Sequence, residues 1–261
     1  MRRTLLALTA LALVAFFSRA RSAPPAAPHE IRYRLAWDAA DEQAVEGSSF
    51  VTTNDRGYRI RIARGYLTSY SMELVECPQG EALSAASEFL WSAVEGTAYA
   101  GHGAGTPNPA AVRPMQIESL TAPGLHEAGK ALPPPQSYCQ VHYLIARAAA
   151  EARDLPGDLD MVDASLHIEG SYTTPGSSTE VPFTLHTAIA NGALLDHATG
   201  QAPIRVDTGR AVTTVTVRRH LARAFDGIDF ATVPPKTLAN LVLQSLVDHV
   251  EVEVESVDAN G

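Results

Sequence analysis

Hydrophobic and polar residues alternate in eight short segments of this chain. A period of two residues is typical of a β-strand that buries one face. The segments with this pattern are 31–35, 58–63, 71–75, 138–145, 164–170, 181–190, 211–220 and 250–254. They predict a protein built mainly from short β-strands.

One late segment has helical spacing instead. Within residues 236–250, one side of a helix would carry Leu238, Leu241, Val242, Ser245 and Leu246. Many strands with a single helix near the C-terminus predict an antiparallel β-sandwich or a barrel-like domain. We expect one β-rich domain over residues 30–261. Within it, residues 81–135 are rich in Ala, Gly and Pro and predict an excursion of loops and short turns.

The first twenty residues have the layout of a secretory signal peptide. Arg2 and Arg3 precede an apolar run over residues 5–17, and Ser18-Arg19-Ala20 offers small residues at positions −3 and −1 of a cleavage site. The alternative, a permanent anchor, is disfavoured because the run is short for a bilayer. Residues 21–29 are a Pro/Ala linker, and no Cys follows the run to carry a lipid. We expect a periplasmic or secreted protein without a membrane anchor.

Charge limits the partners of the exported chain. The formal net charge is −9, and it becomes −12 when Arg2, Arg3 and Arg19 leave with the signal peptide. An acidic chain with dispersed arginines does not attract phosphate backbones, so nucleic acid is not an expected partner. The hydrophobic fraction of 46% is enough to fill a core.

Cys77 and Cys139 are the only cysteines. In an oxidising compartment two cysteines of one exported chain most simply pair, which predicts a disulfide at the base of the 81–135 excursion. The alternative is a pair of soft metal ligands, although no Cys-x-x-Cys spacing is present.

Two histidines are predicted to lie opposite each other in a hairpin. The strand-like segments 164–170 and 181–190 flank Pro175-Gly176-Ser177-Ser178, which suits a two-residue type II′ turn with Gly176 first. In that register the numbers of paired residues sum to 353, so His167 pairs with His186 on the polar face. Opposed Cβ atoms lie about 4.5–5.5 Å apart, close enough for two imidazoles to share a metal ion. The alternative is two solvent-facing histidines that happen to align.

A third histidine could complete the site. His102 lies among glycines in Ala100-Gly101-His102-Gly103, where the chain has the freedom to reach over a neighbouring surface. A surface loop without a function is the alternative. Because no nucleophile motif, phosphate loop or dinucleotide fingerprint is present, we expect no catalytic residues and no enzyme activity.

Three short motifs within residues 135–190 carry a family resemblance. They are Pro135-Gln136-Ser137-Tyr138, Leu166-His167-Ile168-Glu169-Gly170 and Phe183-Thr184-Leu185-His186. In these motifs the chain resembles the MbnP-like family of periplasmic copper-binding proteins, which are exported β-sandwiches. The resemblance implies a copper ion as the cofactor and gives His186 the role of the family histidine. The chain departs from the family where Gln136-Ser137 and Ala188 replace glycines, and it lacks the tryptophan-rich stretch.

Together these observations lead to one expected function and one rival. The first is a periplasmic copper-binding protein, a carrier or accessory without catalysis, that uses His102, His167 and His186 and meets another periplasmic protein. Imidazole nitrogens suit Cu(II), which binds most tightly among the divalent first-row metals. The rival is a metal-free β-sandwich that recognises a partner at the cell envelope. An enzyme acting on cell-surface polymers would need paired carboxylates that the sequence does not offer.

Overall fold

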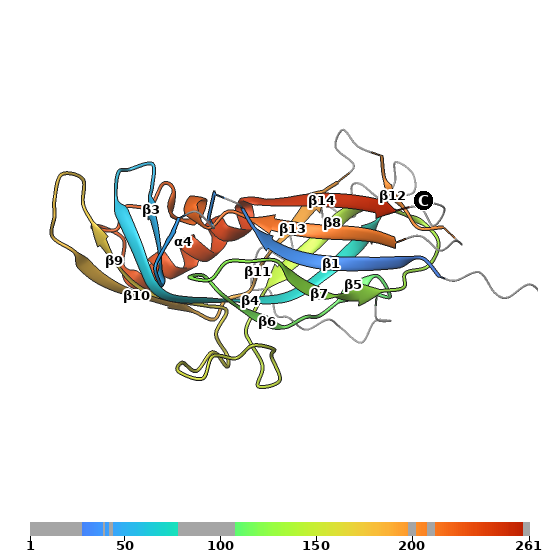
Figure 1. Cartoon of the computed structure of the whole chain (residues 1–261), viewed down its shortest axis with the longest axis horizontal. Helices are drawn as coiled ribbons and strands as arrows, with labels where there is room; N and C mark the ends of the chain where they lie inside the picture. Colours follow the sequence, from blue (N-terminus) through green and yellow to red (C-terminus); the bar gives the residue numbers. More distant parts are fainter. Residues whose placement is uncertain are drawn as a thin grey trace, which may run out of the picture.

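The structure, a computed structural model, describes residues 28–38, 40–41, 44–77, 108–197, 202–207 and 212–257. The proposed signal peptide, most of the proposed linker and His102 lie outside these residues. In the described part the chain is mainly β, with one helix near the C-terminus, as the hydrophobic pattern predicts (Figure 1).

Four strands form a smaller sheet, which we name sheet A. Its order is β14-β13-β1-β7. The strands are β14 (Val250–Val257), β13 (Val212–Arg219), β1 (Glu30–Trp37) and β7 (His126–Ala131). The β1–β13 pair is parallel, and the other pairs are antiparallel.

The larger sheet, sheet B, is organised around one long strand. β4 (Arg59–Glu76) pairs with strands along both of its edges, and the segments predicted at 58–63 and 71–75 are its two ends. On the main path the order is β10-β9-β4-β3-β2. The other strands are β2 (Val45–Glu46), β3 (Ser49–Thr53), β5 (Ala111–Val112), β6 (Gln116–Ser119), β8 (Ser137–Ile145), β9 (Leu166–Thr173), β10 (Val181–Thr187), β11 (Asn191–Asp196) and β12 (Ile204–Arg205).

The second half of the predicted excursion contains three strands, β5, β6 and β7. β5 and β6 pair with β4, and β7 pairs with β1, so the prediction of loops and short turns is wrong for residues 111–112, 116–119 and 126–131. These strands are short and are separated by small residues and prolines. They therefore show no long alternating pattern from which a strand could be predicted. The first half of the excursion lies outside the described residues.

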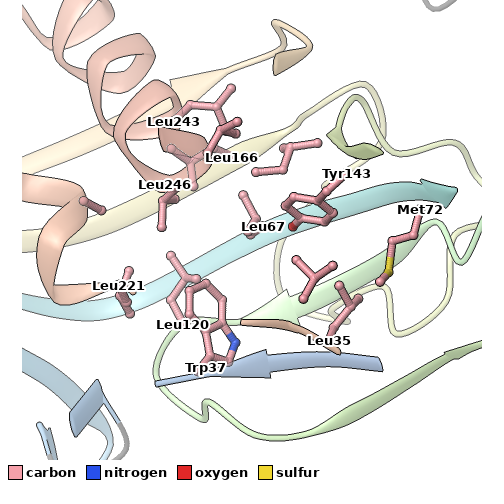
Figure 2. Packing of buried hydrophobic residues seen from close by; sticks show 14 of the residues in the cluster. Leu35, Trp37, Leu67, Met72, Leu120, Tyr143, Leu166, Leu221, Leu243 and Leu246 are labelled. Atoms are coloured by element: carbon pink, nitrogen blue, oxygen red, sulfur yellow. The ribbon is translucent and has the colours of Figure 1, made fainter. Parts of the chain in front are cut away.

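The core lies between the two sheets. Ile31, Tyr33 and Leu35 alternate along β1 and are fully buried, while the residues between them are partly exposed. Figure 2 shows Leu35 and Trp37 with Leu67 and Tyr143, side chains that come from both sheets. This burial is the main stabilising contribution to the fold.

The helix α4 (Pro235–Asp248) covers part of the inner face of sheet B beside β10. Pro235 suits the first helical position, because its fixed φ fits a helix and its missing N–H would have no partner there. Leu238, Val242 and Leu246 are buried as predicted. Leu241 is exposed, so the predicted apolar face is wrong at that position.

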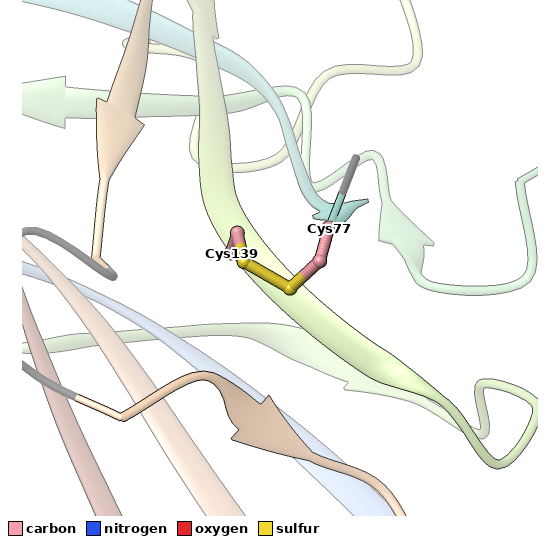
Figure 3. Close-up of a disulfide and its surroundings, with 2 residues drawn as sticks. All are labelled: Cys77 and Cys139. Carbon is pink, nitrogen blue, oxygen red and sulfur yellow. A yellow bond between two sulfur atoms is a disulfide. The ribbon is translucent and has the colours of Figure 1, made fainter. Parts of the chain in front are cut away.

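A disulfide joins Cys77, just after β4, to Cys139 in β8 (Figure 3). The strands are direct neighbours, so the bond fixes the point where the chain leaves β4. The predicted pairing is confirmed. Within the described residues, no helix is long and apolar enough to cross a membrane.

Candidate functional site

Six polar side chains form a patch on the outer face of sheet B. Register places them in two rows across β4, β9 and β10, and we call them the polar patch. The first row is Tyr66, His167 and His186, and the second is Arg64, Glu169 and Thr184. Partners in a row lie on the same face of the sheet. The opposite face carries Leu166, Ile168 and Leu185, which belong to the core.

His167 and His186 are a direct cross-strand pair, as predicted. Their ring centroids are 5.9 Å apart, and the rings stand at 67° to each other. A metal ion about 2 Å from a ring nitrogen lies about 3 Å from the ring centre, so two rings that share an ion have centres within about 6.5 Å. The observed separation is inside that limit. His167 is buried and His186 is exposed, so an ion between them would be open to solvent on one side.

The hairpin that pairs them has a different turn from the predicted one. Thr174 O accepts a hydrogen bond from Ser177 N at 3.0 Å, and Gly176 has φ +77°. Pro175 and Gly176 therefore occupy the two central positions of a type II turn, and the type II′ prediction is wrong. The strands are joined by a longer loop over residues 174–180. The numbers of paired residues still sum to 353, so the predicted register is observed.

Glu169 connects His167 of the pair to Arg64. Its Oε1 lies 2.9 Å from Nε2 of His167, and both of its oxygens accept hydrogen bonds from Nη2 of Arg64, at 2.7 and 2.8 Å. The Arg64 guanidinium, and secondly the hydrogen bond from His167, hold the pKa of Glu169 below its usual value. Glu169 is therefore a carboxylate at neutral pH.

Arg64 is itself held on its other side. Its Nη1 donates to Oδ2 of Asp158 at 2.9 Å, and Tyr66 reaches the same carboxylate at 3.4 Å. The hydrogen bond that Arg64 donates keeps the pKa of Asp158 below its usual value. Sequence patterns identify Glu169 as a member of the polar face but give no signal for Arg64 or Asp158. Asp158 lies in an irregular segment that only the folded chain brings alongside β4.

The other described histidines have separate places in the fold. His142 Nδ1 lies 3.0 Å from Glu73, and His126 Nδ1 lies 3.2 Å from the Gln116 amide. His249, at the end of α4, bonds to Ser245 O of its own helix. None of these residues belongs to the polar patch. The predicted third ligand, His102, lies outside the described residues.

A second polar cluster is buried, unlike the polar patch on the outer face of sheet B. Arg219 and Glu118 are fully buried between the sheets, and Ser69 and Tyr143 bond to them. The Arg219 guanidinium stacks on Trp37 at 4.3 Å. With no exposure to solvent, this cluster has a structural role.

In the part of the chain that the structure describes, no group of three or more His, Cys, Asp or Glu side chains is arranged to hold a metal ion. The polar patch thus offers two imidazoles and one engaged carboxylate. Comparisons with protein-family models, with curated proteins and with solved structures find no match to this chain.

Proposed function

We propose that this protein is an exported metal-binding protein that carries a copper ion on the polar patch, with His167 and His186 as ligands. The observation that supports the proposal best is the cross-strand pairing of two imidazoles whose centroids are 5.9 Å apart. Rigid neighbouring strands hold both rings before an ion arrives, which lowers the ordering cost of binding.

The donor set favours copper over the harder metals. Mg²⁺ and Ca²⁺ prefer oxygen ligands, and the nearest carboxylate, Glu169, is already engaged by Arg64. Two imidazole nitrogens suit Cu(II), the tightest binder in the divalent series. The remaining ligands would be His102, as the sequence suggests, or water.

Three further observations support an exported carrier. The N-terminal residues have the layout of a signal peptide, and the Cys77–Cys139 disulfide is compatible with an extracellular location. The motifs over residues 135–190 resemble those of the MbnP-like periplasmic copper proteins. A carrier also needs no catalytic base. In this role the protein would receive or deliver its ion through another periplasmic protein.

The metal content of the protein tests the proposal. The chain is expressed with its N-terminal segment, purified from the periplasm without a histidine tag, and measured by inductively coupled plasma mass spectrometry. About one copper per chain is expected after incubation with Cu(II) and desalting. Protein that retains no metal would favour the metal-free recognition protein, and retention of Zn²⁺ alone would keep the site and change its ion.

A further inference from the structure

The carboxylate of Glu169 is held in one position by a chain of ionic hydrogen bonds. Arg64 donates to both of its oxygens, and Arg64 is bound on its far side by Asp158. Glu169 and His167 lie two residues apart on one face of β9. The Oε1 atom that faces His167 is therefore held in place from β4.

This arrangement decides which nitrogen of His167 carries the proton. A carboxylate that accepts two hydrogen bonds from a guanidinium has no hydrogen to give, so the contact between Oε1 and Nε2 at 2.9 Å requires Nε2–H as the donor. In the neutral ring the lone pair is then on Nδ1. Metal-binding histidines in proteins commonly donate their other ring N–H to a carboxylate in this way.

Glu169 is poorly suited to be a ligand itself. Both of its oxygens already accept hydrogen bonds from Arg64, and a cation brought to them would face that guanidinium. Its neighbour Thr184, directly opposite on β10, has no charge to offer. The carboxylate thus acts on the ion through His167.

We infer that Glu169, clamped by Arg64, is a positioning residue that fixes His167 in the Nε2–H tautomer and leaves Nδ1 as its metal-binding nitrogen. The inference rests on the proposed function for its metal, but the tautomer is a property of the metal-free protein. It can therefore be tested without any ion.

Long-range ¹H–¹⁵N correlation spectra of the imidazoles in the metal-free wild-type protein give the first test. The His167 ring is expected to show the Nε2–H tautomer, whereas a Nδ1–H ring or an equal mixture would overturn the inference. In Glu169→Gln, Arg64 retains the amide oxygen, so the amide N–H₂ faces Nε2 of His167 and the proton moves to Nδ1. Glu180→Gln changes an exposed carboxylate that bonds to Ser171, and it should leave the His167 spectrum unchanged.

Cu(II) titration gives the second test. Glu169→Gln should bind the ion about 10–100-fold more weakly than wild type, and Glu180→Gln should bind it equally well. Undiminished binding by Glu169→Gln would overturn the positioning role. If wild-type protein binds no Cu(II), the proposed function is contradicted, but a change from the Nε2–H to the Nδ1–H tautomer in Glu169→Gln would still confirm the control of the tautomer by Glu169.

Discussion

Arg219 and Glu118 form a two-pronged ion pair that is fully buried between the sheets, with N–O distances of 2.5 and 2.6 Å. Arg219 lies on β13 of sheet A and Glu118 on β6 of sheet B. The pair therefore connects the two layers of the sandwich. A buried charge is tolerated only with a partner, because the lost hydration is large.

Removal of one partner should cost more than removal of both. Glu118→Leu leaves the guanidinium without its counter-charge and should lower the free energy of unfolding by about 3–5 kcal/mol. The double variant Glu118→Leu/Arg219→Met removes both charges and should recover most of that loss. Urea denaturation of the two variants and wild type measures the difference. If the double variant is the less stable of the two, the pair is not coupled in this way.

Gly170 in β9 leaves no room for a side chain between β9 and the backbone of β4. A Cβ at this position would stand 2.1 Å from Arg61 O and 3.0 Å from the Phe183 ring. Gly170→Ala should therefore destabilise the protein by about 1–3 kcal/mol or more, since backbone must move. Gly124→Ala is the matched control, because nothing lies within 4 Å of its added Cβ. Equal thermal midpoints for the two variants would disprove the close approach.

The disulfide closes a loop of 62 residues. Such a loop loses much of its entropy in the unfolded chain when it is cross-linked, so Cys139→Ala should cost about 2–5 kcal/mol. Folded wild-type protein should show no thiol that reacts with Ellman's reagent, and denatured, reduced protein should show two. A reactive thiol in the folded wild type would be inconsistent with the bond.

Two buried histidines predict a pH dependence of stability. Burial, as the largest cause, lowers the pKa of His29 and His197 from the ordinary value of 6.5. The unfolded chain binds these protons more readily, so the stabilisation is complete above pH 6.5 and is lost as the pH falls toward the folded values. The double variant His29→Asn/His197→Asn should show a smaller drop in unfolding free energy between pH 7 and pH 5 than wild type. An equal drop would assign the dependence to other groups.

The sequence predicts most of the fold where pairing is local. The His167–His186 pairing was predicted from a two-residue turn between two alternating strands. It is observed although the turn is different, because the loop over residues 174–180 returns the chain in the same register. The centre of β4 was not predicted, since Thr68 and Ser69 are polar residues that lie buried. Ser69 is buried because it bonds to Glu118 and Tyr143, partners 49 and 74 residues away.

The candidate site is predictable from the sequence only in its local part, the hairpin of β9 and β10. Alternation brings His167, Glu169 and His186 to one face, but Arg64 reaches that face only because β4 is bulged between Ile62 and Arg64. Asp158 arrives through an irregular segment with no periodic pattern. Contacts of this kind depend on the folded chain and not on local sequence.

Cu(II) binding by single and double histidine variants tests the central claim most directly. Isothermal titration is carried out on wild type, His167→Ala, His186→Ala, the double variant and the control His249→Ala, whose ring bonds to its own helix. Each single change in the pair should weaken binding at least about tenfold, and the double change should cost much less than the sum, because one lost ligand already breaks the site. The control should bind like wild type. Affinity that neither strand variant changes, or that His249→Ala lowers equally, would contradict a shared site on the polar patch.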